Sequence, residues 1–174
     1  MTVVADTGPL IALAKIEALH LLRNLYQQVI TGPAVYTEAV TAGMAMNAPD
    51  AAALEMAYQQ GMLMVRTPSS ASLPHPDLLH AGEAESIQLA IELEAEWLLM
   101  DDLGARRIAQ NSLTAANRST AIKGTLGMIV TAAHIQVIAP EQAVDFVQAL
   151  RGRPDVWLAP ALCDAVIKIL QRLR

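Results

Sequence analysis

Acidic residues stand directly after two apolar runs of the sequence, at the points where a strand would pass into a turn. Asp6 follows the run Val3–Ala5, and Asp101 and Asp102 follow the run Trp97–Met100. In an open α/β sheet, ligands bind at the carboxyl ends of the strands, so these acids would share one edge if both strands are parallel and central. Asp is also a favoured helix N-cap, a structural role that explains a single such Asp about as well as catalysis does. Because two strands end in acidic residues, a catalytic role for these acids is favoured over helix capping alone.

Two glutamates could add carboxylates to the same edge. On a helix over 81–96, Glu83 shares a face with Ile87 and Ile91, which predicts that it points inward near the helix start. Glu85 lies about 200° away around that helix and is expected in solvent. A favourable interaction with the helix N-terminus would explain Glu83 without any chemistry. Glu38 stands among small apolar residues, where an acid has little structural reason to be.

Three or four carboxylates in one crevice would repel one another and raise each other's pKa values, and divalent cations relieve that repulsion. Sites made only of oxygen ligands suit Mg²⁺ or Mn²⁺, which keep several waters and bind phosphate oxygens. Such a site polarises a phosphoryl group, activates water and stabilises the leaving oxygen. Asp6, Glu83 and Asp101 therefore predict hydrolysis of a phosphodiester.

The hydrophobic pattern predicts the elements that must position these acids. Short apolar runs bounded by turn residues indicate strands, and apolar residues at helical spacing indicate helices. The expected strands cover 3–5, 29–31, 62–66 and 97–100, with weaker ones at 120–122 and 137–138. The expected helices cover 9–14, 17–25, 32–43, 49–61, 81–96, 103–111, 125–134, 141–150 and 160–173, with loops over 67–80 and 113–119. Because strands alternate with helices, the sequence predicts an α/β fold with a mainly parallel sheet covered on both faces.

Length and composition favour one folded domain over residues 1–174, with C-terminal helices from about 140 packing on it. The chain has 174 residues, of which 53% are hydrophobic and 17% are charged, so disorder is not expected. The single cysteine, Cys163, excludes an internal disulfide and is expected in the core of a protein from a reducing compartment. No apolar run reaches the roughly 18 residues of a membrane span. A soluble cytoplasmic protein is the expectation.

The charge is unevenly distributed along the chain. The net charge is −5, yet residues 1–102 contain 13 acids and 3 bases, whereas residues 103–174 contain 4 acids and 9 bases. Such asymmetry can mark a nucleic-acid partner, although chance differences between solvated helices explain it as well. Arg106, Arg107, Arg118 and Lys123 fall near the expected edge and are candidates for phosphate contacts.

Three stretches together resemble a known family. The stretch Val4–Leu13, with Asp6-Thr7-Gly8-Pro9 inside it, resembles the opening motif of PIN-domain nucleases. Residues 82–90, followed by 98–102, resemble one bacterial and archaeal branch of that family, and Gly124–Gly127 fits the same branch. The branch is similar to the VapC-like toxins of toxin–antitoxin pairs. The resemblance covers residues 2–138 and implies a three-layer α/β/α fold, Mg²⁺-dependent endoribonuclease activity and, usually, a dimer.

The resemblance also implies roles, position by position. Asp6 matches the first acid, Glu38 the acid on the helix after the second strand, and Glu83 the acid of the central helix. The last acid matches Asp101 or Asp102, and the alignment does not choose between them. Asp6, Glu38, Glu83 and Asp101 are thus the expected catalytic residues, with Asp102 as a further candidate metal ligand and Arg106, Arg107 and Lys123 as RNA contacts. The stretch 107–124 is longer than this branch leads one to expect.

Other signals carry less weight. His75, Asp77 and His80 could be drawn as a metal site, but they fall in a proline-rich loop without a partner motif and are expected in solvent. A phosphatase with an Asp-x-Asp nucleophile would need an acid at position 8, which is Gly8. No Gly-x-Ser-x-Gly motif is present. The methionines at 44, 46, 56, 62 and 64 are expected to fill the core.

Three functions remain after this reasoning. The first is an active ribonuclease, the toxin of a pair, which needs a cognate antitoxin that covers its acidic groove. The second is a PIN-fold module that binds protein or RNA without catalysis, and the third is a phosphohydrolase acting on small molecules. The complete set of acids favours the first. A homodimer is also expected, because the last helix carries an apolar stripe that consists of Val166, Ile169, Leu170 and Leu173.

Overall fold

The computed structural model describes residues 1–70 and 77–173. Its centre is a parallel sheet whose strands lie in the order β3-β2-β1-β4-β5. The strands are β1 (Val3–Ala5), β2 (Val29–Thr31), β3 (Leu63–Val65), β4 (Trp97–Leu99) and β5 (Ala121–Lys123). The first strand of the chain is therefore the middle strand of the sheet, and the predicted parallel α/β fold is confirmed.

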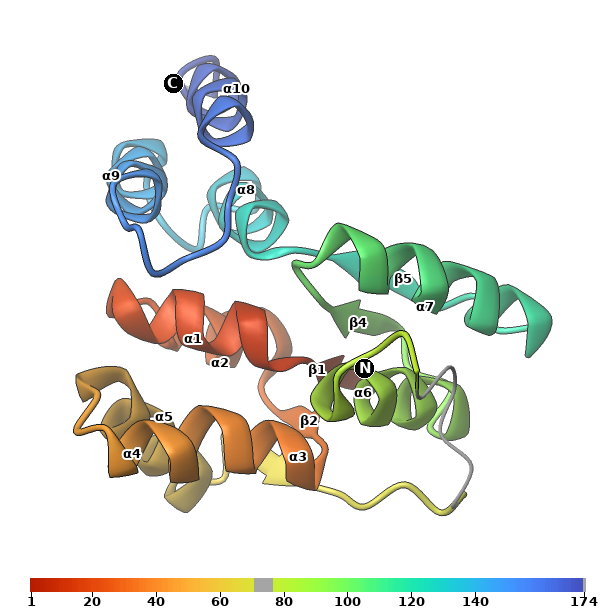
Figure 1. The fold of residues 1–174 in the computed structure, drawn as a ribbon. Coiled ribbons are helices and arrows are strands. Elements are labelled where there is room, and N and C mark those ends of the chain that lie inside the picture. The colour runs from red at the N-terminus through yellow and green to blue at the C-terminus, as the bar shows by residue number, and fades with distance from the viewer. Residues whose placement is uncertain (71–76, 174) are drawn as a thin grey trace.

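Helices fill the connections between the strands. They are α1 (Thr7–Lys15), α2 (His20–Tyr26), α3 (Pro33–Tyr36), the π-helix η1 (Thr37–Ala42), α4 (Gly43–Ala45), α5 (Pro49–Gln59), α6 (Ala81–Glu92), α7 (Leu103–Ala115), α8 (Thr125–His134), α9 (Pro140–Arg151) and α10 (Pro160–Leu170). Figure 1 shows the sheet between two groups of helices, with α6 and α7 on one side and α1 on the other. This is the predicted three-layer arrangement.

Side chains that alternate along the central strands supply the two cores. Val3 and Ala5 of β1 and Leu99 of β4 belong to a cluster that includes side chains of α1, α2, α5 and α8. Val4 and Leu98 point the other way, into a cluster made with α6 and α7. Strands that are buried on both faces need continuous apolar runs, which is what β1 and β4 have.

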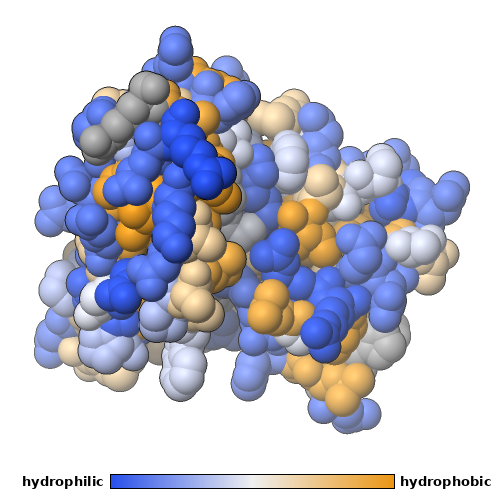
Figure 2. Space-filling view, turned by 90° about the horizontal axis from the view of Figure 1, so that it is seen from above, coloured by the Kyte–Doolittle hydropathy of each residue, from blue (hydrophilic) through white to orange (hydrophobic). Residues whose placement is uncertain are grey.

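The last two helices extend the first of these cores. Apolar residues of α9 and α10 join the same cluster as α1 and α8, and Cys163 lies fully buried among them, as predicted. Figure 1 places α9 and α10 beyond α8, at the end of the molecule away from α6. Looking down on that end, Figure 2 shows a hollow between the α9–α10 part and the α7 part, with apolar side chains on both sides. Within the described ranges no helix is long and apolar enough to cross a membrane.

Several local expectations were wrong. Val137 and Ile138 form no strand, because Val137 N donates to Ala132 O and closes the end of α8 around Gln136, which has a φ of 61°. Helix α7 continues past residue 111 to Ala115, so the unexpectedly long stretch after Arg107 partly lengthens a helix, and the expected loop begins only after Ala115. The helix continues because the buried residues Ala105, Ala109 and Leu113 repeat at four-residue spacing.

The methionines are not core filler either. Met44, Met46, Met56 and Met64 are exposed, and only Met62 of the five is buried. These residues lie on α4, α5 and the edge strand β3, where one face of each element has no layer above it.

Candidate active site

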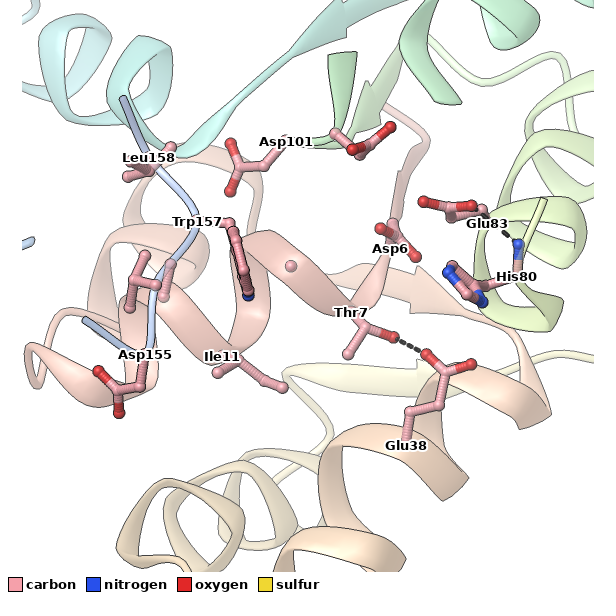
Figure 3. Close-up of a pocket in the computed structure, with 14 residues that line it drawn as sticks. Asp6, Thr7, Ile11, Glu38, His80, Glu83, Asp101, Asp155, Trp157 and Leu158 are labelled. Atoms are coloured by element: carbon pink, nitrogen blue, oxygen red, sulfur yellow. Dashed lines mark hydrogen bonds between the residues drawn. The ribbon is translucent and has the colours of Figure 1, made fainter. Parts of the chain in front are cut away.

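One cavity of about 640 Å³ gathers the predicted acids at the carboxyl edge of the sheet. Its acidic lining consists of Asp6, Glu38, Glu83, Asp101, Asp102 and Asp155, of which all but the last were predicted as site residues. In Figure 3 the labelled acids come from separate segments of the chain and surround the start of α1. The edge forms because Asp6 N donates to Leu99 O at 2.9 Å, which carries the ladder between β1 and β4 up to the acids.

Asp6 is the most deeply placed carboxylate of the group. It is only 6% exposed and stands directly before α1, as the residue preceding its first turn. Burial raises the pKa of Asp6 to about 7, and the charges of Glu83 and Glu38 add to that rise, while the nearby backbone N–H groups of Thr7 and Gly8 oppose it. The structure therefore holds a carboxylate whose negative charge is costly unless a cation compensates it.

Glu38 and Glu83 reach the cavity from different helices. On η1, Glu38 accepts hydrogen bonds from Thr7 Oγ1 at 2.6 Å and from Gly82 N at 3.2 Å, so it joins the starts of α1 and α6. Glu83 accepts from His80 N at 2.9 Å, a bond that returns to the residue before α6 and fixes the carboxylate at the helix start. Figure 3 shows the bond from Thr7 Oγ1 to Glu38 and the bond from His80 N to Glu83 as dashed lines.

The two consecutive aspartates after β4 differ in what they do. The partly buried Asp101 accepts from Thr125 N at 2.8 Å and from Thr125 Oγ1 at 2.5 Å, at the start of α8. Burial raises the pKa of Asp101, although the bonds to Thr125 and the charge of Arg106 oppose the rise. Asp102 is exposed and accepts from Ala105 N at 2.7 Å, which makes it the N-cap of α7. Asp102 thus has a structural role as a helix cap, and both aspartates line the cavity.

Helix N-termini explain how so many acids can share one edge. The backbone amides that donate to Glu38, Asp101 and Asp102 belong to the first turns of α6, α8 and α7, where N–H groups have no partner inside the helix, and Asp6 directly precedes the first turn of α1. The positive ends of these helices favour negative charge. None of the four takes part in an ion pair within residues 1–70 and 77–173.

The donor set fits a hydrated divalent ion better than a closed protein cage. In the part of the chain that the structure describes, no three Asp, Glu, His or Cys residues are gathered closely enough to hold a metal by themselves. Asp6 Oδ2 and Asp101 Oδ2 lie 4.0 and 3.9 Å from the position that a Cβ on Gly8 would take, so they flank a small open space. Mg²⁺ commonly binds through one or two carboxylates and keeps several waters, an arrangement that this edge can accommodate.

The predicted RNA contacts are not equally well placed. Arg106 lines a second cavity of about 570 Å³ that adjoins the first and shares Asp101 and Asp102 with it. Arg107 is exposed on α7 and lines neither cavity. Lys123 borders the second cavity, but its ammonium group donates to Thr131 Oγ1 at 3.0 Å and lies 3.8 Å from the ring centroid of Trp97.

Arg118, the fourth basic candidate, has a structural role. Its Nη1 lies 2.7 Å from Glu94 Oε1, and its Nε donates to Ile91 O. Arg106 is thus the predicted base that stands closest to the acids.

The expectation about Glu85 needs correction. Glu85 is not simply solvated: it is half-buried, and its Oε2 accepts from Ala34 N at 2.7 Å at the start of α3, where the helix leaves that amide without a partner. His80 is exposed immediately before α6, as expected, and it also lines the acidic cavity. Asp77 is exposed, and His75 lies outside the described residues.

Sequence reasoning missed one segment of the cavity altogether. The loop between α9 and α10 brings Asp155, Val156, Trp157 and Leu158 to its wall. A loop has no periodicity that would reveal its direction, and its residues follow the last acid of the motifs by more than fifty positions. Only the long-range contacts of the folded chain reveal it.

Comparison with known proteins gives one informative result. A family model of the PIN domain matches residues 2–172, which is almost the whole chain. The searches of curated proteins and of solved structures return no match. PIN domains are generally nucleases that use divalent metal ions, and both the parallel α/β sheet and the acidic cavity at its carboxyl edge agree with that assignment. The chain belongs to the PIN-domain family and has a nuclease fold.

Proposed function

We propose that this protein is an endoribonuclease that depends on Mg²⁺ or Mn²⁺ and hydrolyses RNA phosphodiester bonds. The observation that carries the proposal is Asp6, a buried carboxylate with a raised pKa that shares one cavity with five other acids, while no Lys or Arg stands among the lining residues. An acid that only caps a helix start needs neither deep burial nor several other acids beside it.

The side chains divide the work as follows. Asp6, Glu83 and Asp101 are the proposed ligands, and a divalent ion bound there supplies Lewis acidity toward a phosphoryl oxygen and the activation of water. Thr7 and Gly82 hold Glu38 at the rim, where it fixes the starts of α1 and α6 relative to each other. Thr125 holds Asp101, and Asp102 caps the helix that carries Arg106.

Arg106 is the proposed contact for the phosphate next to the scissile one. It stands at the edge of the acidic cavity and has no carboxylate within ion-pair distance among the described residues, so its guanidinium is available to a phosphate oxygen. RNA, and not DNA, is proposed because the sequence resembles the toxin branch of the family.

The same resemblance supports a role as the toxin of a toxin–antitoxin pair in the cytoplasm. The antitoxin would cover the acidic cavity, and a basic side chain of the antitoxin would pair with the carboxylates that line it. A second copy of this chain is the other proposed partner.

One observation favours a second candidate, a PIN-fold module that binds RNA or protein without cutting. Glu38, Glu83 and Asp101 all accept hydrogen bonds from the protein, and no three metal-ligating residues of the described chain stand close together. A PIN-fold site that never binds a metal would show the same hydrogen bonds and the same spacing of its acids.

Cleavage of a panel of structured RNAs distinguishes the two candidates. The wild-type protein should cut in Mg²⁺ or Mn²⁺ and stop in EDTA, and Asp6→Asn should lower the rate by roughly 100-fold or more, because the metal contributes several kcal/mol. Asp145→Asn, an exposed acid on α9, is the matched control and should cut normally. Equal cleavage by wild type and Asp6→Asn, or cleavage that persists in EDTA, would rule out this mechanism. An intact RNA panel would favour the binding module.

A further inference from the structure

Trp157 is 97% exposed although it stands at the mouth of the acidic cavity. Tryptophan is highly buried on average, so an indole left almost wholly in solvent needs a reason. Its two neighbours do not share its exposure, because Val156 and Leu158 pack against the main hydrophobic cluster. The loop between α9 and α10 therefore packs Val156 and Leu158 against the protein and leaves the Trp157 ring between them in solvent.

Ion pairs fasten this loop to the first helix of the chain. Asp155 accepts from Lys15 Nζ at 2.7 Å and from Arg153 Nε at 2.9 Å. Lys15, whose side chain is only 15% exposed, also lies 3.6 Å from Asp50, and Arg153 Nη1 donates to Lys15 O at 3.4 Å. These contacts hold the backbone beside Trp157 in place, so the ring is presented from an ordered support.

Trp157 and Leu158 form the boundary between the two cavities. Both residues line the carboxylate-rich cavity of about 640 Å³ and also the adjoining one of about 570 Å³. The second cavity has a basic side, at Arg106, and an apolar wall that consists of Leu126, Leu158, Leu162 and Val166. Figure 3 shows the indole between Leu158 and Ile11, on the opposite side of the cavity from Glu83 and His80. Figure 2 shows the hollow between the α10 and α7 parts.

We propose that this second cavity is a nucleotide subsite, in which an unpaired base stacks on Trp157 while its phosphate contacts Arg106. The proposal rests on the proposed nuclease function and specifies the substrate: a nucleic acid that is single-stranded beside the bond to be cut. This lining favours a flat nucleobase, which can pack between the indole face and the aliphatic wall. Arg106 lines the same cavity and supplies a cation for the attached phosphate. Both volumes fall within the roughly 300–1,000 Å³ of ordinary ligand sites.

Stacking on Trp157 would also select for an unpaired base. A base inside a duplex has both faces covered by its neighbours, so only an unpaired base can use Trp157. Every base has a π-face, so the subsite should be tolerant of sequence and selective for strandedness. Because the indole is uncharged, it should add nothing to the salt dependence of binding, which belongs to Arg106.

Binding in EDTA tests the subsite apart from cleavage. The probes are fluorescein-labelled oligouridine and oligoadenosine, the same oligomers with abasic positions, and a hairpin of equal length. Trp157→Ala should weaken binding of the intact oligomers by roughly five- to a hundredfold, and Trp157→Phe should recover most of that loss. Ile135→Ala, which removes an exposed apolar side chain outside both cavities, should bind normally. Arg106→Ala should reduce the salt slope by about one, and Trp157→Ala should leave it unchanged.

Fluorescence gives a second readout on the folded protein. The chain has two tryptophans, so Trp97→Phe leaves Trp157 as the only indole. Addition of the intact oligomer should quench it, and the abasic oligomer should not.

Unchanged oligomer binding in Trp157→Ala would overturn the subsite, and so would an equal loss of affinity for intact and abasic oligomers. A third contrary result is a Trp157→Ala protein whose oligomeric mass in solution changes while its RNA binding does not, which would make Trp157 a protein contact. The subsite and the nuclease can fail separately. Base-dependent binding by a wild-type protein that cuts no RNA in any metal would support the subsite and remove the proposed function. Normal cleavage and binding by Trp157→Ala would remove the subsite and leave the proposed function.

Discussion

At the scale of single residues, the protonation of Asp6 links stability to metal binding. Its pKa in the native protein is about 7, against about 3.8 for an ordinary aspartate. The native state therefore holds a proton that the unfolded chain has released across the interval between these values. Its stabilising contribution is complete below about pH 4 and is lost as the pH rises through about 7.

In EDTA we expect the melting temperature of the wild type to fall from about pH 5 to about pH 8 by more than that of Asp6→Asn, which lacks the titrating group. Millimolar Mg²⁺ should raise the wild-type melting temperature above about pH 7, since the ion binds only the folded, deprotonated site. The ion should have much less effect at pH 5 and on the variant. Thermal unfolding over this pH range measures both effects. Parallel pH curves for the two proteins would contradict the assignment.

Gly124 controls the position of a second acid. A Cβ at this residue would lie 2.7 Å from Asp101 Oδ1 and 3.2 Å from Arg106 Nη1, both at the ends of side chains that can move. Gly124→Ala should therefore displace the carboxylate without unfolding the protein, and it should lower metal affinity and cleavage by roughly ten- to a hundredfold.

Gly152→Ala provides the matched control, because its nearest contacts would be ordinary ones at 3.7 Å. Titration calorimetry with Mn²⁺ and a melting curve separate displacement from unfolding. A Gly124→Ala protein with unchanged Mn²⁺ affinity would show that Asp101 is not a ligand.

At the scale of secondary structure, the two aspartates after β4 should separate by role. Asp102 caps α7, so Asp102→Ala should cost about 1 kcal/mol of stability, whereas Asp102→Asn keeps an acceptor and should be close to wild type in both stability and cleavage. Asp101→Asn should lose cleavage and lower metal affinity. Urea unfolding and the RNA assay measure the four proteins together. Loss of activity in Asp102→Asn that equals the loss in Asp101→Asn would make Asp102 a ligand as well.

Elements with strong local signals were predictable, and the rest depended on contacts made elsewhere. The apolar runs that become β1 and β4 fix the edge where Asp6 and Asp101 stand, and the inward face of α6 follows from its spacing. Local periodicity does not reveal the π-turn in η1, which carries Glu38, because an α-helix fits the same residues. Nor does it reveal Glu85 at the start of α3, since that contact joins residues 51 positions apart.

The site shows the same division. Acids that follow strands could be assigned because a parallel sheet brings strand ends together whatever the rest of the fold is. His80 and Trp157 could not, because each reaches the cavity from a loop whose direction is set by packing. Thr125 could not either, because it holds Asp101 through a contact between residues 24 positions apart. The long loop between the last two helices is placed by Lys15, near the opposite end of the sequence.

At the scale of the whole molecule, the last helix exposes part of its predicted stripe and buries the remainder. Val166 and Leu170 pack inside the chain, whereas Ile169 and Leu173 are 48% and 38% exposed. We therefore expect dimerisation to use the outer residues, and light scattering at micromolar concentration should give twice the 18.6 kDa of one chain.

Ile169→Asp should shift that mass to the monomer, and Ile135→Asp on the exposed end of α8 should not. A single 18.6 kDa species in the wild type would remove the proposed dimer.

The central place of β1 in the sheet has a consequence for the protein as it is being made. The strand that pairs with β1 at the acidic edge is synthesised about ninety residues after Asp6, and Thr125, which holds Asp101, comes later still. Contacts this distant in sequence form late, after the intervening chain has emerged. A nascent chain that stalls or is truncated before this point carries acids but no assembled edge. The proposed nuclease activity would therefore be absent from unfinished copies of the chain.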